Sequence, residues 1–215
     1  MTYKLSPSSL NLMKECPRCF WLAQHKVWNR PQGIFPSLPS GMDKVLKEHF
    51  NKFMERGELP PELRNNGHTD KMKLFDDHEL LAIWRSNFKG IQWEDKDGNI
   101  LKGAVDNILM KGKKLIVLDY KTRGYALKED TAEHYQNQLD IYNFLLRKLG
   151  YDTEDYAFLL FYMPKEVLEN GDIVFVKELV KMKVDVKNAG NIFENAIKLL
   201  NNDCPKEICK WCEGR

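Results

Sequence analysis

Two carboxylates and a lysine lie near the middle of the sequence, each at the end of an apolar stretch. Asp106 follows the pair Ala104 and Val105, and Asp119 and Lys121 end an apolar run that begins at residue 115. Successive strand residues point to opposite faces, so Asp119 and Lys121 share one face, about 7 Å apart along the strand. Two adjacent carboxylates stay ionised only when a cation lies between them. Hard oxygen ligands of this type suit Mg²⁺ or Mn²⁺.

Such an ion would polarise a phosphodiester and lower the pKa of a bound water. Lys121 could orient that water or offset charge on the pentavalent phosphate. The alternative is a surface hairpin with a salt-bridged aspartate and lysine, because D-x-K also occurs by chance. Asp119, however, ends an apolar strand that should be central in a sheet, where an unpaired aspartate is costly. This context favours a catalytic centre at Asp106, Asp119 and Lys121.

The elements that must position these residues are short strands followed by a long helix. The pattern predicts strands at residues 90–94, 100–110, 113–121, 156–162 and 173–184. The first three form a three-strand antiparallel meander, with turns at Asp97-Gly98 and Lys111-Gly112. The second turn brings Asp106 alongside Asp119.

Helical patterns flank this core on both sides. They predict helices at residues 6–13, 20–25, 41–54, 77–86, 132–149 and 188–200. Prolines and glycines predict an irregular connection over 29–40 and a surface loop over 57–70. The fold class is therefore α/β (α+β), as one domain over 1–215. It has an N-terminal helical part (about 1–88), a core (about 89–186) and a C-terminal helix with a cysteine tail (about 187–215).

The central motifs resemble the PD-(D/E)XK nuclease superfamily, in particular its RecB-like branch. The resemblance rests on Gly103-x-x-Asp106, a twelve-residue gap, and the sequence Asp-Tyr-Lys-Thr from Asp119. Downstream, Gln138 and Tyr142 match the Q-x-x-x-Y motif of that branch, and residues four apart share one helix face. The resemblance implies a restriction-endonuclease-like core, a central mixed sheet of order αβββαβ flanked by helices.

The resemblance also implies roles for individual residues. Asp106, Asp119 and Tyr120 would bind Mg²⁺ or Mn²⁺, and Gln138 and Tyr142 would order the active site and the DNA. Related enzymes add a metal-binding histidine from an early helix.

His49 lies on the corresponding helix of this chain. It follows Gly41 by eight residues, where the family spacing is four. A solvated helix histidine is the equal alternative for His49, and Asp43 and Glu48 are other possible ligands on that helix.

Five cysteines lie only at the two ends of the chain, as Cys16, Cys19, Cys204, Cys209 and Cys212. Two C-x-x-C pairs can supply a complete tetrahedral thiolate shell. The alternative, five unrelated buried thiols, fits poorly with clustering at the termini. In a reducing cytosol, where we expect this protein, the thiols should not form disulfides.

The sequence leaves two choices for the metal that the cysteines would bind. RecB-like nucleases of the CRISPR-associated exonuclease kind carry a [4Fe-4S] cluster on one N-terminal and three C-terminal cysteines. Cys16, Cys204, Cys209 and Cys212 meet that count, but their spacing departs from the family pattern. The departure favours Cys16, Cys19, Cys209 and Cys212, with Cys204 spare. This set could hold Zn²⁺ as readily as the [4Fe-4S] cluster that the resemblance favours.

Together these features predict a metal-dependent DNA nuclease. The resemblance implies an exonuclease on single-stranded DNA or DNA ends, in repair, recombination or mobile-element and CRISPR processing. Arg123, just beyond the active strand, is the expected phosphate contact. Net charge is +2, which neither indicates nor excludes a basic groove. Alternatives are an inactive nucleic-acid-binding or scaffold module, or an RNA-directed nuclease. No apolar run is long enough to span a membrane.

Overall fold

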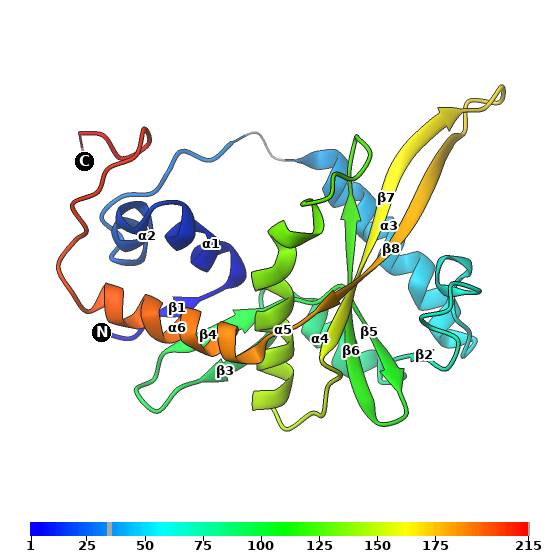
Figure 1. The fold of residues 1–215 in the computed structure, drawn as a ribbon, viewed down its shortest axis with the longest axis horizontal. Helices are drawn as coiled ribbons and strands as arrows, with labels where there is room; N and C mark the ends of the chain where they lie inside the picture. Colours follow the sequence, from blue (N-terminus) through cyan, green and yellow to red (C-terminus); the bar gives the residue numbers. More distant parts are fainter. Residues whose placement is uncertain (34–35, 215) are drawn as a thin grey trace.

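The main sheet has five strands in the order β2-β5-β6-β7-β8 (Figure 1). This is a computed structural model that describes residues 1–33 and 36–214. The strands are β2 (Lys73–Leu74), β5 (Asn107–Lys111), β6 (Lys114–Thr122), β7 (Tyr156–Val167) and β8 (Ile173–Lys183). β6 and β7 are parallel and the other neighbours are antiparallel. A helix, α5 (Gln136–Lys148), connects the two parallel strands. The predicted α/β class with a mixed sheet is confirmed.

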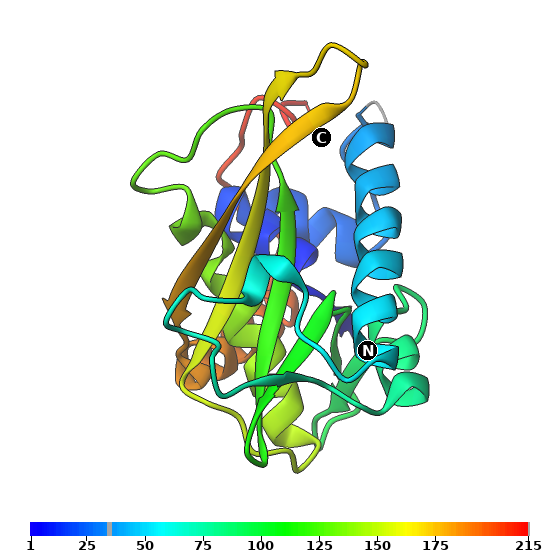
Figure 2. The same cartoon turned by 90° about the vertical axis from the view of Figure 1, so that its right-hand side faces the viewer.

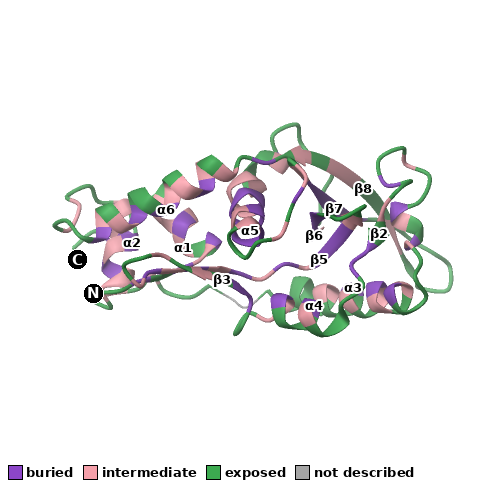
Figure 3. Ribbon diagram, turned by 90° about the horizontal axis from the view of Figure 1, so that it is seen from below, coloured by how far each residue is buried: buried purple, intermediate pink, exposed green. Residues whose placement is uncertain are grey.

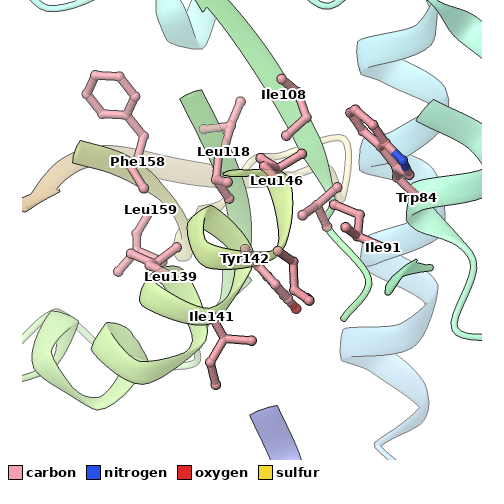
Figure 4. Packing of buried hydrophobic residues seen from close by; sticks show 14 of the residues in the cluster. Trp84, Ile91, Ile108, Leu118, Leu139, Ile141, Tyr142, Leu146, Phe158 and Leu159 are labelled. Carbon is pink, nitrogen blue, oxygen red and sulfur yellow. The ribbon is translucent and has the colours of Figure 1, made fainter. Parts of the chain in front are cut away.

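Helices cover both faces of this sheet (Figure 2). On one face, Leu139 and Leu146 of α5 share the hydrophobic core with Leu159 of β7 (Figure 4). On the other face, Phe50 of α3 (Ser37–Glu55) packs on the ring of Tyr120, with ring centroids 4.6 Å apart. β6 and α5 are therefore largely buried (Figure 3), and residues of β6 that alternate in sequence face different helices.

A second sheet, of order β1-β4-β3, corrects the predicted meander. It contains β1 (Lys4–Leu5), β3 (Ile91–Glu94) and β4 (Ile100–Gly103). The predicted strand over 100–110 breaks after Gly103, so β4 pairs with β3 whereas β5 pairs with β6. The break occurs because the backbone N–H of Val105 leaves the ladder and donates to the carbonyl of Trp84, 3.2 Å away.

The other helices follow the sequence pattern closely. They are α1 (Pro7–Glu15), α2 (Pro17–Gln24), α4 (His78–Arg85) and α6 (Val186–Leu200), with 3-10 turns at Pro61–Leu63 and Ala132–Tyr135. α3 begins at Ser37, four residues before the predicted start, because its first turn tolerates Pro39. The predicted irregular connection over 29–40 therefore ends earlier, and its residues 34–35 lie outside the described residues. None of the helices in the described parts of the chain has the length and apolar character to span a membrane.

Candidate active site and cysteine metal site

Asp106 lies at the edge of the main sheet, one residue before the pairing of β5 with β6 begins, and is thereby directed toward Asp119. It precedes β5, whose first residue, Asn107, pairs with Leu118. The backbone N–H of Tyr120 donates to Asp106 Oδ2 at 2.9 Å, so the carboxylate is held against β6. On its other side, Arg85 Nε donates to the carbonyl of Asp106 at 2.7 Å. The break after β4 thus places this carboxylate at the end of β6.

Asp119 is the most buried group of the site, with 1% of its surface exposed. Gln138 Nε2 donates to its Oδ1 at 3.2 Å, and Lys121 forms an ion pair with Oδ2. Apart from Lys121, no group in the described chain donates to Oδ2. Burial, and then repulsion from Asp106, raise the pKa of Asp119 to about 7, although Lys121 acts in the opposite direction. A cation bound at Oδ2 would stabilise the ionised form.

Gln138 connects three groups of the site through one amide. Its Nε2 donates to both Asp119 Oδ1 and the hydroxyl of Tyr142, the latter at 2.7 Å, and its Oε1 accepts from Lys121 Nζ at 3.1 Å. Lys121 Nζ also lies 4.6 Å from the ring centroid of Tyr135. These contacts fix the ammonium beside Asp119 on the α5 face of the sheet.

Lys47, on α3, is a site residue that the sequence analysis missed. Its Nζ lies 3.2 Å from Asp106 Oδ1 and 2.8 Å from Asp43 Oδ2. Burial acts to lower the pKa of Lys47, but the charges of Asp106 and Asp43 outweigh it and raise the pKa. The four-residue spacing of Asp43 and Lys47 was the available signal. Each carboxylate of the central pair therefore contacts an ammonium group.

The residues present suit a divalent cation with open coordination positions. Mg²⁺ is commonly held by one or two carboxylates and completed by water and substrate phosphate. Asp106 and Asp119 supply two carboxylates, and the buried Asp119 Oδ2 has the ion pair with Lys121 as its one contact among the described groups. Within residues 1–33 and 36–214, no third histidine or carboxylate joins these two as a compact group of ligands.

His49 lies on α3, in contact with a different acidic residue. Its Nε2 is 3.2 Å from Glu62 Oε1, and its ring packs edge-on against Phe53. Glu62 Oε1 also accepts from the hydroxyl of Tyr162 at 3.2 Å. A metal-binding role for His49 stays a prediction, and in this arrangement its imidazole is held by Glu62.

Tyr120 lies near the carboxyl end of β6, and Arg123 follows the last residue of that strand. The phenol of Tyr120 lies on the α3 face, where it accepts from Asn107 Nδ2 at 2.7 Å, so Tyr120 anchors Asp106 through its backbone N–H. Arg123 follows β6, and its backbone N–H donates to the carbonyl of Tyr162 at 3.0 Å. Metal binding by Tyr120 and phosphate binding by Arg123 stay predictions.

Four of the five cysteines, two from each end of the chain, form one compact cluster. The Sγ atoms of Cys16, Cys19, Cys209 and Cys212 all lie within 4.8 Å of one another. These are the four residues favoured by the C-x-x-C spacing. Cys204 lies outside this group and accepts a hydrogen bond from Arg18 Nη1 at 3.4 Å. The sulfur atoms are arranged for a metal site.

The surroundings of the four thiols act on their ionisation in different directions. The backbone N–H of Cys19 donates to Cys16 Sγ at 3.4 Å, and that of Cys209 donates to Cys212 Sγ at 3.3 Å. Backbone N–H groups, first that of Trp211, lower the pKa of Cys209 to about 6. Burial raises the pKa of Cys19 to about 12. A metal cation would stabilise all four as thiolates.

A comparison with protein families gives a match over almost the whole chain. The family model described as the PD-(D/E)XK nuclease superfamily matches residues 4–215. One similar solved structure is described as "Crystal structure of SSO0001", with 17% sequence identity over 99% of this chain and 84% of that chain, and a TM-score of 0.43. That likeness is too distant to support an inference. A search of curated proteins found no match.

Proposed function

Because the chain belongs to the PD-(D/E)XK nuclease superfamily, we propose that it is a divalent-metal-dependent deoxyribonuclease that hydrolyses phosphodiester bonds. The observation that carries the proposal is the placement of Asp106 opposite Asp119, with Lys121 and Gln138 in contact with the second carboxylate. A salt-bridged surface hairpin would not need a buried carboxylate held by an ammonium and an amide from two different elements.

Each side chain has a distinct role in the proposed reaction. Asp106 and Asp119 would hold Mg²⁺ or Mn²⁺, which when bound polarises the phosphate and lowers the pKa of a bound water. Lys121, fixed by Gln138, would offset the negative charge that grows on the phosphate in the transition state. Tyr142 would act indirectly, because its hydroxyl holds the amide of Gln138 in place.

The finer features of the function are also proposals. The resemblance of the motifs supports an exonuclease on single-stranded DNA or DNA ends, working in repair, recombination or mobile-element and CRISPR processing. It also supports a [4Fe-4S] cluster at the cysteine site, with Zn²⁺ as the alternative. We propose a cytoplasmic location, since a thiolate site of this kind suits a reducing compartment.

A cleavage assay tests the proposed activity. The purified protein, with its cysteine site filled, is incubated with end-labelled single- and double-stranded DNA and with matched RNA, in Mg²⁺, Mn²⁺ or EDTA. We expect metal-dependent DNA cleavage that is lost in Asp119→Asn and Lys121→Ala and kept in Lys113→Ala, an exposed turn variant. Absence of cleavage by the folded protein with every metal would reject the proposal, and preferred cleavage of RNA would correct the substrate.

A non-catalytic nucleic-acid-binding or scaffold module is the second candidate. The observation that favours it is the contact of Lys47 with Asp106, because this ammonium takes up a carboxylate oxygen that a metal would need. The assay separates the two: a module of this kind binds DNA but does not cleave it, and Asp119→Asn leaves its affinity unchanged.

A further inference from the structure

A pocket of about 290 Å³ opens beside the candidate catalytic residues. It lies between the start of α1, the segment after α4, the end of β4 and α5, where Gln138 and Tyr142 form part of its wall. Gln138 contacts both Asp119 and Lys121, so the pocket is one side chain away from the proposed reaction centre. Gln138 therefore belongs both to the wall of this pocket and to the proposed reaction centre.

The lining of this pocket suits an anion. Lys102 is its one ionised residue among those described, and the rest of the lining is hydroxyl, amide, phenol or small side chains. Its neutral polar members are Ser6, Ser8, Asn11, Asn87 and Gln138. No carboxylate in this lining opposes a bound phosphate.

Lys102 keeps one N–H available for a ligand. Its Nζ donates to the carbonyls of Asn87 at 2.7 Å and Phe88 at 3.0 Å. An ammonium group has three donors, so the third is free to contact the pocket's occupant. Both partners are neutral, and no described carboxylate forms an ion pair with Lys102, so its charge is not compensated. The two carbonyls therefore hold the ammonium in position without neutralising it.

The surface beyond Asn11 is unfavourable for further phosphates. A neighbouring pocket of about 740 Å³ shares Asn11 with the first. Its charged lining residues are Lys14, Glu15, Asp130, Glu133 and His134. Glu15 is paired with Arg30, and the other two carboxylates still outnumber the one lysine, so this surface is less favourable for a phosphodiester chain than the first pocket. The favourable site for an anion thus ends after the first pocket.

We propose that the Lys102 pocket binds the last nucleotide of a strand and that Lys102 contacts a terminal phosphate on it. This inference rests on the proposed nuclease function. The volume, at the lower end of the range for small-ligand pockets, suits one nucleotide. In the hydrolysis, water oxygen bonds to the phosphorus that links the last two nucleotides, the P–O bond to the leaving sugar oxygen breaks, and that oxygen takes up a proton. One nucleotide leaves.

The proposal is tested with the holoprotein on single-stranded DNA that ends in a 5′-phosphate, a 3′-phosphate or hydroxyls only. We expect one phosphorylated end to be preferred by about tenfold in kcat/KM, mainly through KM, as for a hydrogen bond to a charged group. Lys102→Gln keeps a donor for the two carbonyls but removes the charge, and it should abolish the preference. Lys102→Arg should retain it, as should Lys113→Ala, and melting temperatures confirm that each variant is folded.

The outcomes distinguish this proposal from the proposed activity. Cleavage of all three DNAs at equal rates, or a preference that survives in Lys102→Gln, overturns the terminal-phosphate site while the nuclease proposal stands. If the wild type cleaves nothing, the nuclease proposal fails and the pocket is judged by binding. Fluorescence anisotropy then compares phosphate-ended with hydroxyl-ended DNA on the wild type and Lys102→Gln. Equal affinity of the wild type for both DNAs overturns the terminal-phosphate site. A preference for phosphate-ended DNA that is lost in Lys102→Gln supports that site.

Discussion

Gly103 and Tyr142 are packed so closely that no side chain could stand at position 103. A Cβ on Gly103 would lie 2.5 Å from Cε1 of the Tyr142 ring, a distance at which one of the two must move. This contact joins the end of β4 to α5 just before the chain reaches Asp106. The glycine of the Gly-x-x-Asp motif therefore serves the position of Tyr142, whose hydroxyl holds Gln138.

We expect Gly103→Ala to destabilise the protein by about 1–3 kcal/mol, as overpacking of a buried contact does. Because the displaced Tyr142 can no longer hold Gln138, the cleavage rate should fall as well. Tyr142→Phe removes only the hydroxyl and should cost about 1 kcal/mol. Thermal melts measure the stability of both variants, and cleavage assays measure their rates. If Gly103→Ala lowers the stability of the Tyr142→Ala variant by as much as it lowers that of the wild type, the contact with the Tyr142 ring is not the cause of the loss.

Asp119 should make the stability of the metal-free protein depend on pH. Its pKa is raised from 3.8 to about 7 in the folded state, so folding favours the protonated form. The contribution of Asp119 to the free energy of unfolding is fully present below about pH 4 and is lost as the pH rises through about 7. In EDTA at about pH 8, Asp119→Asn should therefore melt at a higher temperature than the wild type. The expected difference is about 2–4 °C for each kcal/mol by which the substitution raises the free energy of unfolding.

The same variant supplies its own control. At about pH 4 the two proteins should melt at similar temperatures, because Asp119 is then protonated. Saturating Mn²⁺ should stabilise the wild type at about pH 8 and leave Asp119→Asn almost unchanged. A wild type that is more stable than Asp119→Asn in EDTA at about pH 8 would contradict the assigned direction of the pKa.

The sequence was most informative where local pattern decides structure. The core helices and strands follow from apolar periodicity and turn residues, and the placement of Asp106 opposite Asp119 follows from the turn at Gly112. The predicted meander was wrong because its break depends on a distant partner, the carbonyl of Trp84, that accepts the N–H of Val105. No residue type between positions 100 and 110 indicates that Val105 would bond to Trp84.

Contacts between distant elements were equally hidden. Lys47 approaches Asp106 only because α3 crosses the sheet, and Arg85 reaches Asp106 from α4. His49 was selected by its helix, but the side of α3 that it occupies leads to Glu62. The cysteines were easier, since pairs of C-x-x-C spacing can form only a few compact arrangements.

Lys47 should compete with a metal ion for Asp106. Its Nζ lies 3.2 Å from Asp106 Oδ1, so Lys47→Met frees that oxygen and removes a nearby positive charge. We expect the Mn²⁺ concentration for half-maximal thermal stabilisation to fall severalfold, since one pair of this kind contributes about 1–2 kcal/mol. Lys44→Met, on the exposed side of the same helix, is the matched control. A higher Mn²⁺ requirement in Lys47→Met would show that the ammonium supports the metal site.

Removal of the metal from the cysteine site should disturb the Lys102 pocket through α1. This helix begins at Pro7, beside the pocket that Gln138 lines, and ends next to Cys16. Structural Zn²⁺ sites contribute about 10–16 kcal/mol in small domains, which is comparable with the whole stability of a protein. We therefore expect chelation to loosen α1, α2 and the C-terminal tail first. Hydrogen exchange over residues 7–24, together with circular dichroism, measures this.

Two cysteine variants show whether the effect comes from the cluster itself. Cys212→Ser removes one of the four clustered thiols, so it should lose the bound metal, lower the melting temperature and reduce cleavage together. Cys204→Ser removes the thiol outside the cluster and should keep metal content, stability and cleavage unchanged. Metal analysis of the purified variants identifies iron or zinc. Loss of metal in Cys204→Ser would place Cys204 among the ligands, and an unchanged melting temperature in metal-free Cys212→Ser would show that the cluster does not hold α1.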